Sequence, residues 1–243
     1  MEARANRRLN LFIAILLFAI AAEGLYVFLQ SSFLNVRTIE VAGSSKVKKE
    51  RIIKLSGINR KTGFFRFSNT TVEKHIKSES WIDGVKVDKT WLLNVRISVT
   101  ERTPVAVLLV GSTYCLIDKQ GVVLEAGKQN TFGSLPLIAD TPVRAPPKKG
   151  GRIRDRSVTN TLDCLKGLDK RIIDEADRLS APSIDGLTIN LRSGLIILYG
   201  KAELTDQKNY AIDVILEEAR KEGKQWKYID VRVPSNPAAM PAA

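Results

Sequence analysis

The chain of 243 residues is 44% hydrophobic and 26% charged, a balance that allows a buried core and excludes a wholly disordered protein. Its net charge of +12 would attract acidic proteins, anionic lipid or nucleic acid at long range. The basic residues are scattered, however, without interleaved aromatic residues or a nucleic-acid-binding motif, so we expect no nucleic-acid partner.

The N-terminal segment has the pattern of a membrane anchor. An apolar stretch runs from residue 11 to residue 29 with Glu23 as its one charged residue, and it is long enough to cross a bilayer as a helix. Three basic residues precede it: Arg4, Arg7 and Arg8. By the positive-inside rule we predict a cytoplasmic tail at residues 1–8, a transmembrane helix at residues 9–30, and export of the remainder.

A cleaved signal peptide is the alternative for this segment. The apolar stretch is longer than a typical signal-peptide core, and its small-residue site, Ala19-Ile20-Ala21, lies inside the stretch and not after it. An uncleaved signal anchor is therefore the favoured prediction. Glu23 either reaches the lipid–water interface or packs against the transmembrane helix of a partner.

Residues 33–102 carry the pattern of a small α+β domain. We expect a strand, two helices and two further strands, in this order: residues 33–41, 47–55, 70–80, 85–88 and 93–100. The first helix is expected to end at Gly57, and the last two strands to be joined by a turn at Lys89 and Thr90. Thr70 and Glu73 fit a capping box at the start of the second helix, which we prefer to a glycosylation site at Asn69. Two helices on one face of a three-stranded sheet make a compact unit.

A second domain, of strands and helices, is predicted at residues 103–233. Six strands are expected: residues 104–110, 114–117, 122–125, 187–191, 195–199 and 228–233. Two helices are expected: residues 155–172 and 206–222, the second with Ala211, Val214, Ile215 and Ala219 on one apolar stripe and ended by Gly223. Residues 234–243 are small residues and prolines and are expected to form a disordered tail.

The join between the two domains contains Glu101, Arg102 and Pro104. Proline cannot extend a central strand, so Pro104 marks a boundary between sheets. Glu101 and Arg102 either pair across this boundary or form a solvated pair that contributes little.

Residues suited to catalysis or metal binding are few. Cys115 and Cys164 lack metal-ligand spacing and form either a disulfide or two buried thiols. His75 is the only histidine and has no accompanying carboxylate pattern. Serine-hydrolase and zinc-protease motifs do not occur, so we expect neither an enzyme nor a cofactor.

Three stretches in chain order resemble a known family. They are Trp91 with the strand that leads to ERTPVA at residues 101–106, LIDKQGVV at residues 116–123, and IDVRVP at residues 229–234. Together with the anchor and the strand–helix–helix–strand–strand unit, they resemble the FtsQ/DivIB cell-division family, whose members carry a POTRA domain after one membrane helix. One residue departs from that pattern: Leu92 stands where the family often has proline.

The resemblance implies an α+β fold with a transmembrane helix, a POTRA domain at residues 33–102 and an FtsQ-type β domain at residues 103–233. It implies a divisome scaffold that links early and late division proteins and influences septal peptidoglycan synthesis. The implied location is the inner membrane at the septum, single-pass type II. The implied partners are FtsB/DivIC-like and FtsL-like bitopic coiled-coil proteins, with other divisome proteins at the POTRA domain.

The resemblance also implies a partner-binding site at the last strand of the β domain. The six corresponding residues are Tyr228, Ile229, Asp230, Val231, Arg232 and Val233. A terminal strand at a sheet edge has free amides and carbonyls with which a partner strand pairs. The alternative for these residues is an ordinary edge strand that Arg232 and Pro234 protect. The alternative functions are an exported cell-wall hydrolase and a POTRA-containing adaptor unrelated to division.

Overall fold

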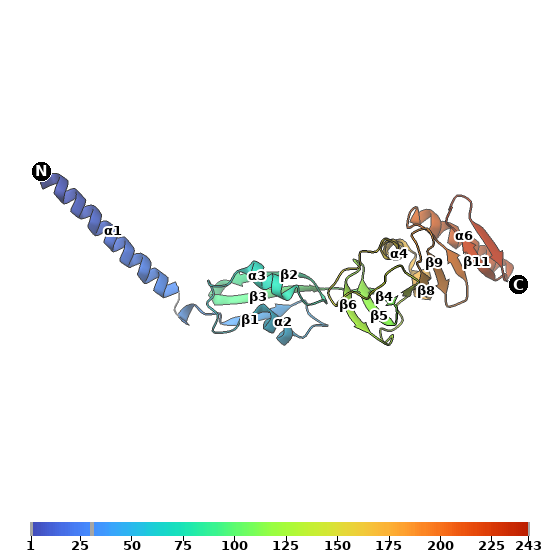
Figure 1. Cartoon of the computed structure of the whole chain (residues 1–243), viewed down its shortest axis with the longest axis horizontal. Coiled ribbons are helices and arrows are strands. Elements are labelled where there is room, and N and C mark those ends of the chain that lie inside the picture. Colours follow the sequence, from blue (N-terminus) through green and yellow to red (C-terminus); the bar gives the residue numbers. More distant parts are fainter. Residues whose placement is uncertain (1, 30–31, 243) are drawn as a thin grey trace. The chain divides into compact units, whose positions relative to one another are not determined.

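The computed structural model describes residues 2–29 and 32–242. They form two compact units, one ending at Glu101 and the other beginning at Arg102 (Figure 1). Each unit contains its own sheet and its own hydrophobic core, and helices accompany both sheets. The predicted α+β class is therefore confirmed.

The first unit begins with helix α1, Glu2–Leu29. All side chains between residues 12 and 28 are exposed, among them the large apolar Phe12, Leu17 and Phe18. Across the described residues, no helix combines the length and the hydropathy that crossing a membrane requires. The predicted transmembrane helix extends to residue 30, which lies outside the described residues, as do residues 1, 31 and 243.

The rest of the first unit is a three-stranded sheet with two short helices. Its elements are η1 (Ser32–Leu34), β1 (Thr38–Ala42), α2 (Lys49–Ser56), α3 (Asn69–Ile76), β2 (Ile82–Thr90), η2 (Trp91–Leu93) and β3 (Asn94–Glu101). Strand β3 is central and pairs in parallel with β1 and antiparallel with β2. The predicted order of elements is confirmed. Ile52 of α2 and Ile76 of α3 are completely buried in the core that the helices share with the sheet.

The start of α3 differs from the prediction. The capping box at Thr70 and Glu73 is wrong, because Glu73 Oε1 instead accepts the amide of Val87 in β2 at 2.9 Å. Asn69 Nδ2 donates to the carbonyl of the same Val87 at 2.7 Å. Both side chains therefore hold the helix against the sheet. A local sequence pattern does not reveal such a tertiary contact, since capping boxes are defined by neighbours along the chain.

The turn between β2 and β3 also differs from the prediction. We expected it at Lys89 and Thr90, but β2 continues through Thr90 and η2 forms the turn. Leu92 and Leu93 adopt left-handed backbone conformations with φ of 63° and 64°, which costs energy in a residue that has a side chain. Proline fixes φ near −65°, so a proline in place of Leu92 would exclude the turn that this chain adopts.

The second unit is built on one nine-stranded sheet. Its strands are β4 (Pro104–Val110), β5 (Thr113–Asp118), β6 (Val123–Gly127), β7 (Leu137–Ala139), β8 (Ala176–Ser180), β9 (Thr188–Leu191), β10 (Ile196–Leu198), β11 (Trp226–Asp230) and β12 (Ala238–Pro241). Their order across the sheet is β12-β11-β10-β9-β8-β7-β4-β5-β6. The predictions for β4, β5, β6, β9 and β10 are confirmed. Strands β7, β8 and β12 were not predicted, because such short strands show little alternation.

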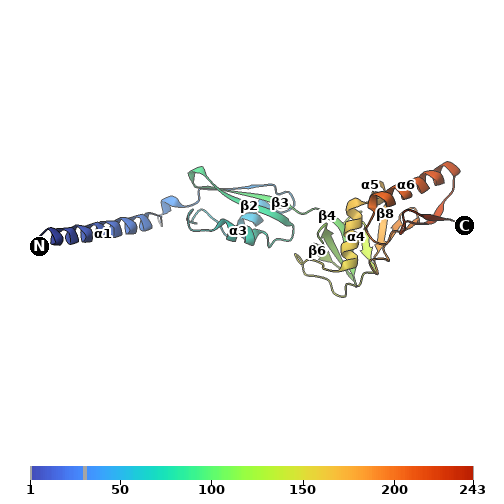
Figure 2. The ribbon, with the colours of Figure 1, turned by 90° about the horizontal axis from the view of Figure 1, so that it is seen from above.

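The helices of the second unit are α4 (Arg156–Gly167), α5 (Lys170–Glu175) and α6 (Thr205–Glu222) (Figure 2). Asp155 caps α4, and its Oδ1 accepts the amides of Ser157 and Val158 at 2.9 and 3.1 Å. The single helix predicted for residues 155–172 is two helices, because Leu168 is extended. Helix α6 ends as predicted at a left-handed Gly223.

Both cysteines are free thiols in the core of the second unit. Cys115 lies on β5 and Cys164 on α4, and neither is exposed. Burial raises the pKa of the Cys164 thiol to about 12, against smaller lowering effects of Tyr199 and Lys208. The thiol is therefore protonated and unreactive at neutral pH. Of the two alternatives that the sequence left open, the structure selects the buried thiols.

Arg102 begins the second unit with a largely buried ion pair. Its Nη1 donates to Asp118 Oδ2 at 2.7 Å, and the Asp118 side chain is only 4% exposed. Asp118 Oδ1 also accepts the amides of Gln120 and Val122 at 2.9 and 2.8 Å, which closes the turn between β5 and β6. The alternative of a merely solvated Arg102 is therefore wrong.

Glu101 ends the first unit and binds a loop of that unit. Its carboxylate accepts the amides of Ser45, Lys46 and Val47 at 3.0, 2.9 and 2.9 Å. Burial alone would raise the pKa of this carboxyl, but the hydrogen bonds from Val47, Lys46 and Ser45 outweigh it and leave the pKa lowered. The charged form therefore stabilises the folded unit.

We predict that Glu101→Gln lowers the free energy of unfolding of the first unit by about 1.5 kcal/mol at pH 7, because an amide oxygen replaces a charged acceptor. The folded pKa lies below the unfolded value of 4.5, so the full difference holds above pH 4.5. This difference in the free energy of unfolding disappears as the pH falls through the pKa of Glu101 in the folded state. Urea unfolding followed by the fluorescence of Trp81 and Trp91, in a Trp226→Phe background, reports this unit.

The control for this experiment is Glu40→Gln in the same sheet. Glu40 lies 3.2 Å from Arg96, and both side chains are more than half exposed. Such a pair contributes less than about 1 kcal/mol. Equal destabilisation by the two substitutions, or a difference that persists at acid pH, would contradict the role assigned to Glu101.

Candidate partner-binding site

The predicted site lies at the C-terminal end of the nine-stranded sheet. Strand β11 spans Trp226–Asp230 and includes only three of the six predicted residues. Ile229 and Val231 are completely buried, since alternate side chains of this segment face the core. Arg232 and Val233 follow in a bend and are exposed. The buried pair anchors the segment in the core, so these two side chains are not available to a partner.

The expectation of an open edge at Tyr228–Val233 is wrong. Strand β11 pairs in parallel with β10 on one side and antiparallel with β12 on the other. The tail predicted to be disordered forms β12 through Pro241, and Ala242 donates its amide to the carbonyl of Gln225 at 2.8 Å. The edge of the sheet is therefore β12, one strand beyond the predicted position.

A tight turn after Val233 brings the chain back onto β11. Asn236 donates its amide to the carbonyl of Val233 at 3.0 Å, with Pro234 and Ser235 between them. Proline is favoured at the second position of such a turn because its φ is already set. The sequence VPSN at residues 233–236 was thus a turn signal, but we interpreted Pro234 only as the end of a strand.

Asp230 and Arg232 hold the end of β11 in place. Arg232 Nε donates to Asp230 Oδ1 at 3.0 Å, and the amide of Arg232 donates to the same oxygen at 3.1 Å. The side-chain hydrogen bond from Arg232 is the largest cause of the lowered pKa of Asp230. This carboxylate therefore supports the bend that leads to β12, and it is not a free ligand for a partner.

The outer edge of β12 offers one free amide. Val231 donates its amide to Leu198 in β10, so the even-numbered residues of β11 direct their backbone groups toward β12. Their partners in the register, Ala238 and Met240, therefore point back at β11. Ala239 lies between these two, so its N–H and C=O point away from the sheet.

The C-terminal part of the unit carries large exposed apolar side chains, which the sequence analysis missed. They are Leu204 (58%), Tyr210 (72%), Val214 (45%), Val233 (60%) and Met240 (45%). Tyr210 and Val214 stand four residues apart on α6 and therefore share one face of that helix. The prediction that Val214 belongs to the buried stripe is wrong, whereas Ala211, Ile215 and Ala219 are buried as predicted.

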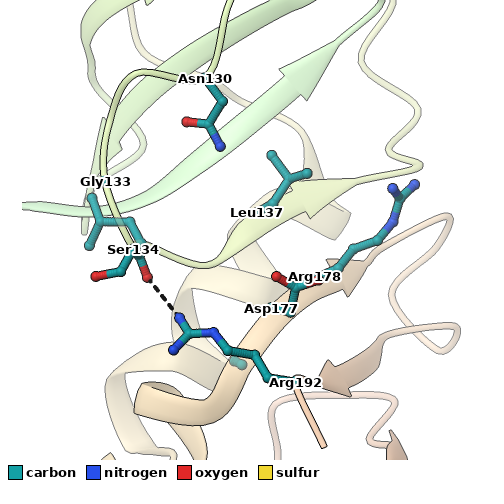
Figure 3. A pocket seen from close by; sticks show the side chains of 9 residues that line it. Asn130, Gly133, Ser134, Leu137, Asp177, Arg178 and Arg192 are labelled. Carbon is teal, nitrogen blue, oxygen red and sulfur yellow. Dashed lines mark hydrogen bonds between the residues drawn. The ribbon is translucent and has the colours of Figure 1, made fainter. Parts of the chain in front are cut away.

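A polar recess of about 390 Å³ lies elsewhere in the unit, between β7, β8 and the chain before β7 (Figure 3). Arg178 extends along its wall and binds Asp140 at 2.8 Å. Arg192 donates to the carbonyl of Ser134 at 3.3 Å. The nine residues that line the recess include no histidine, cysteine or lysine.

Metal-ligating residues are dispersed through the part of the chain that the structure describes. There, no three histidine, cysteine, aspartate or glutamate side chains gather as a metal site would require. His75 is exposed at the end of α3. The surface with the clearest means of binding another molecule is the open edge at β12.

Comparison with known proteins agrees with this division into two units. Residues 34–102 match the family described as POTRA domain, FtsQ-type, and residues 106–232 match the family described as Cell division protein FtsQ/DivIB, C-terminal.

Similar proteins include the cell division protein DivIB of Clostridium tetani, 24% identical over 84% of this chain and 78% of the relative. FtsQ of Corynebacterium glutamicum is 22% identical over 79% of this chain and 82% of the relative. FtsQ of Streptomyces coelicolor is 21% identical over 96% of this chain and 88% of the relative. The chain therefore belongs to the FtsQ/DivIB family of cell-division proteins.

Proposed function

We propose that this division scaffold acts without catalysis and binds an FtsB/DivIC-like coiled-coil protein by strand addition at β12. The free N–H and C=O of Ala239 carry this proposal, because an added strand needs unpaired backbone groups. The two edges of the sheet differ in this respect. At the other edge, Gly150 and Gly151 exchange backbone hydrogen bonds with Val123 of β6 at 2.8 and 2.9 Å. That edge is thereby covered at Val123, whereas β12 is open.

The six residues Tyr228–Val233 have a positioning role in this proposal. Ile229 and Val231 fix β11 in the core, and Asp230 with Arg232 shapes the bend. Val233 leaves its side chain 60% exposed beside the turn, where it adds an apolar contact for a partner. Strand β12 consists of small residues and Met240, so a partner backbone meets little steric hindrance.

The topology belongs to the same proposal. The exposed apolar side chains of residues 12–28 support a membrane anchor, and Arg4, Arg7 and Arg8 support a cytoplasmic N-terminus. Both units then lie outside the cytoplasm at the septum, where an FtsL-like protein joins the complex. Other divisome proteins bind the POTRA domain, and the assembly influences septal peptidoglycan synthesis.

We predict that Ala239→Pro lowers the affinity for the FtsB/DivIC-like partner by about tenfold or more, because it removes the one outward amide. The substitution leaves the pairing of β11 with β12 intact, since the Ala239 amide takes no part in it. Titration of the purified full-length chain with the partner measures the affinity. Amide exchange at Tyr228 and Asp230 reports whether β12 remains paired.

The matched control is Ala239→Ser, which keeps the amide and nearly the same volume. Val231→Pro is unsuitable, because it breaks the hydrogen bond from Val231 to Leu198 in the core. Unchanged affinity in Ala239→Pro, with β12 still protected from exchange, would exclude strand addition at this edge.

We predict that depletion of the protein produces filaments or chains of undivided cells, and that a fluorescent fusion forms a band at midcell. A cell-wall hydrolase would instead leave division normal and alter the chemistry of the wall. Cells that express Ala239→Pro distinguish recruitment to midcell from binding at the edge of β12. The fusion still reaches midcell if other contacts recruit it, whereas division fails if the edge at β12 is needed.

A further inference from the structure

Four large apolar side chains are exposed on the POTRA domain. They are Phe33 (82%), Phe65 (58%), Trp91 (87%) and Leu92 (62%). Single exposed apolar residues are common on protein surfaces, but a group of aromatic residues marks a surface that another phase or molecule covers. These four come from three segments, residues 33–37, 59–67 and 89–94.

The three segments lie together at one end of the domain. Phe64 donates its amide to the carbonyl of Leu34 at 2.8 Å, and Val36 donates to Thr62 at 2.9 Å. Arg37 donates its amide to the carbonyl of Leu93 at 3.0 Å, which joins the hairpin turn to the same end. Figure 2 shows this turn beside the point where the chain enters the domain. We call the surface formed by the three segments the proximal face.

The proximal face is basic as well as apolar. Its three segments contain five cations and no acidic residue; the cations are Arg37, Arg60, Lys61, Arg66 and Lys89. The Lys89 ammonium lies 4.2 Å from the centre of the Phe67 ring and donates to the carbonyl of Phe67 at 2.9 Å. The four arginine and lysine side chains other than Lys89 are exposed.

The backbone holds the apolar tip outward. Leu92 and Leu93 keep left-handed conformations that glycine or asparagine would adopt at lower cost. Trp91 meanwhile remains almost fully exposed, although it is the residue type with most to gain from burial. A turn that served only to connect β2 and β3 would need neither feature.

The proximal face is also the part of the domain closest along the chain to α1. Phe33 follows Leu29, the last residue of α1, by four residues. A chain of that length spans at most about 14 Å. If α1 is a membrane anchor, this link keeps Phe33, and with it one part of the proximal face, close to the lipid headgroups.

We propose that the proximal face binds the surface of the bilayer, with Trp91 and Leu92 in the interfacial layer and the cations on anionic lipid phosphates. Aromatic side chains next to arginine and lysine are typical of membrane interfaces. There the apolar part of the side chain contacts lipid, and its polar part stays in the hydrated headgroup layer. This inference rests on the proposed membrane anchor. It assigns the POTRA domain a fixed position on the membrane, which a flexible tether alone would not give.

The test uses the full-length chain in vesicles of phosphatidylglycerol and phosphatidylcholine. Leu92→Cys introduces a single accessible thiol, because Cys115 and Cys164 are buried, and it is labelled with an environment-sensitive fluorophore. The matched control is Lys77→Cys with the same label, at the residue that directly follows α3. Lipids brominated in the acyl chain should quench the label at residue 92 several-fold more strongly than the label at residue 77.

The outcomes separate this inference from the anchor. Quenching at residue 92 that falls when phosphatidylglycerol is omitted supports the proposal. A chain that floats with the vesicles while its label at residue 92 stays in water overturns the lipid contact and keeps the anchor. A chain that does not float overturns both. A further outcome is that the label at residue 92 becomes less exposed to water as the protein concentration rises, without quenching by brominated lipid. That result assigns the proximal face to contact with a second copy of the chain and overturns the proposal.

Discussion

A β-sheet must end, and each edge leaves backbone amides and carbonyls that need partners. The second unit meets this constraint in two ways. At β6 the chain returns through Gly150 and Gly151 and covers the start of the edge, at Val123, with its own backbone. At the far end, a proline turn adds β12, a strand of four mostly small residues, beyond β11. The open edge is therefore short and almost free of bulky side chains. Such an edge resists pairing with arbitrary strands yet admits a matched one.

The motifs that identify the family act mainly on the fold. Glu101 binds three consecutive amides of its own unit, and Arg102 pairs with Asp118, which closes a turn in the other unit. Asp230 and Arg232 shape the bend before β12 in the same manner. In each case a charged side chain satisfies backbone groups that no strand or helix satisfies. The proposed function depends on these residues indirectly, because they determine where an edge or a turn is placed.

The two units expose different chemistry. The POTRA domain presents aromatic and basic side chains on its proximal face, which suits a hydrated, anionic layer. The β domain presents a backbone edge with scattered apolar side chains such as Tyr210 and Met240, which suits a polypeptide. The two proposed contacts, one with a membrane and one with a protein, need such a separation, because a surface suited to one would bind the other weakly.

Periodicity along the chain was sufficient for the order of elements in the POTRA domain and for the long strands and helices of the β domain. It also identified Gly57 and Gly223 as helix ends, since both lie in the left-handed region that glycine adopts readily. The three strands it missed are short, and the strands that pair with β7 are distant in sequence. Tertiary structure alone decided that Glu73 binds β2 and does not cap a helix, and that both cysteines are free thiols. It also decided that the open edge is β12 and not β11. A segment of alternating residues predicts a strand, but whether the strand is an edge depends on which other segments reach its backbone.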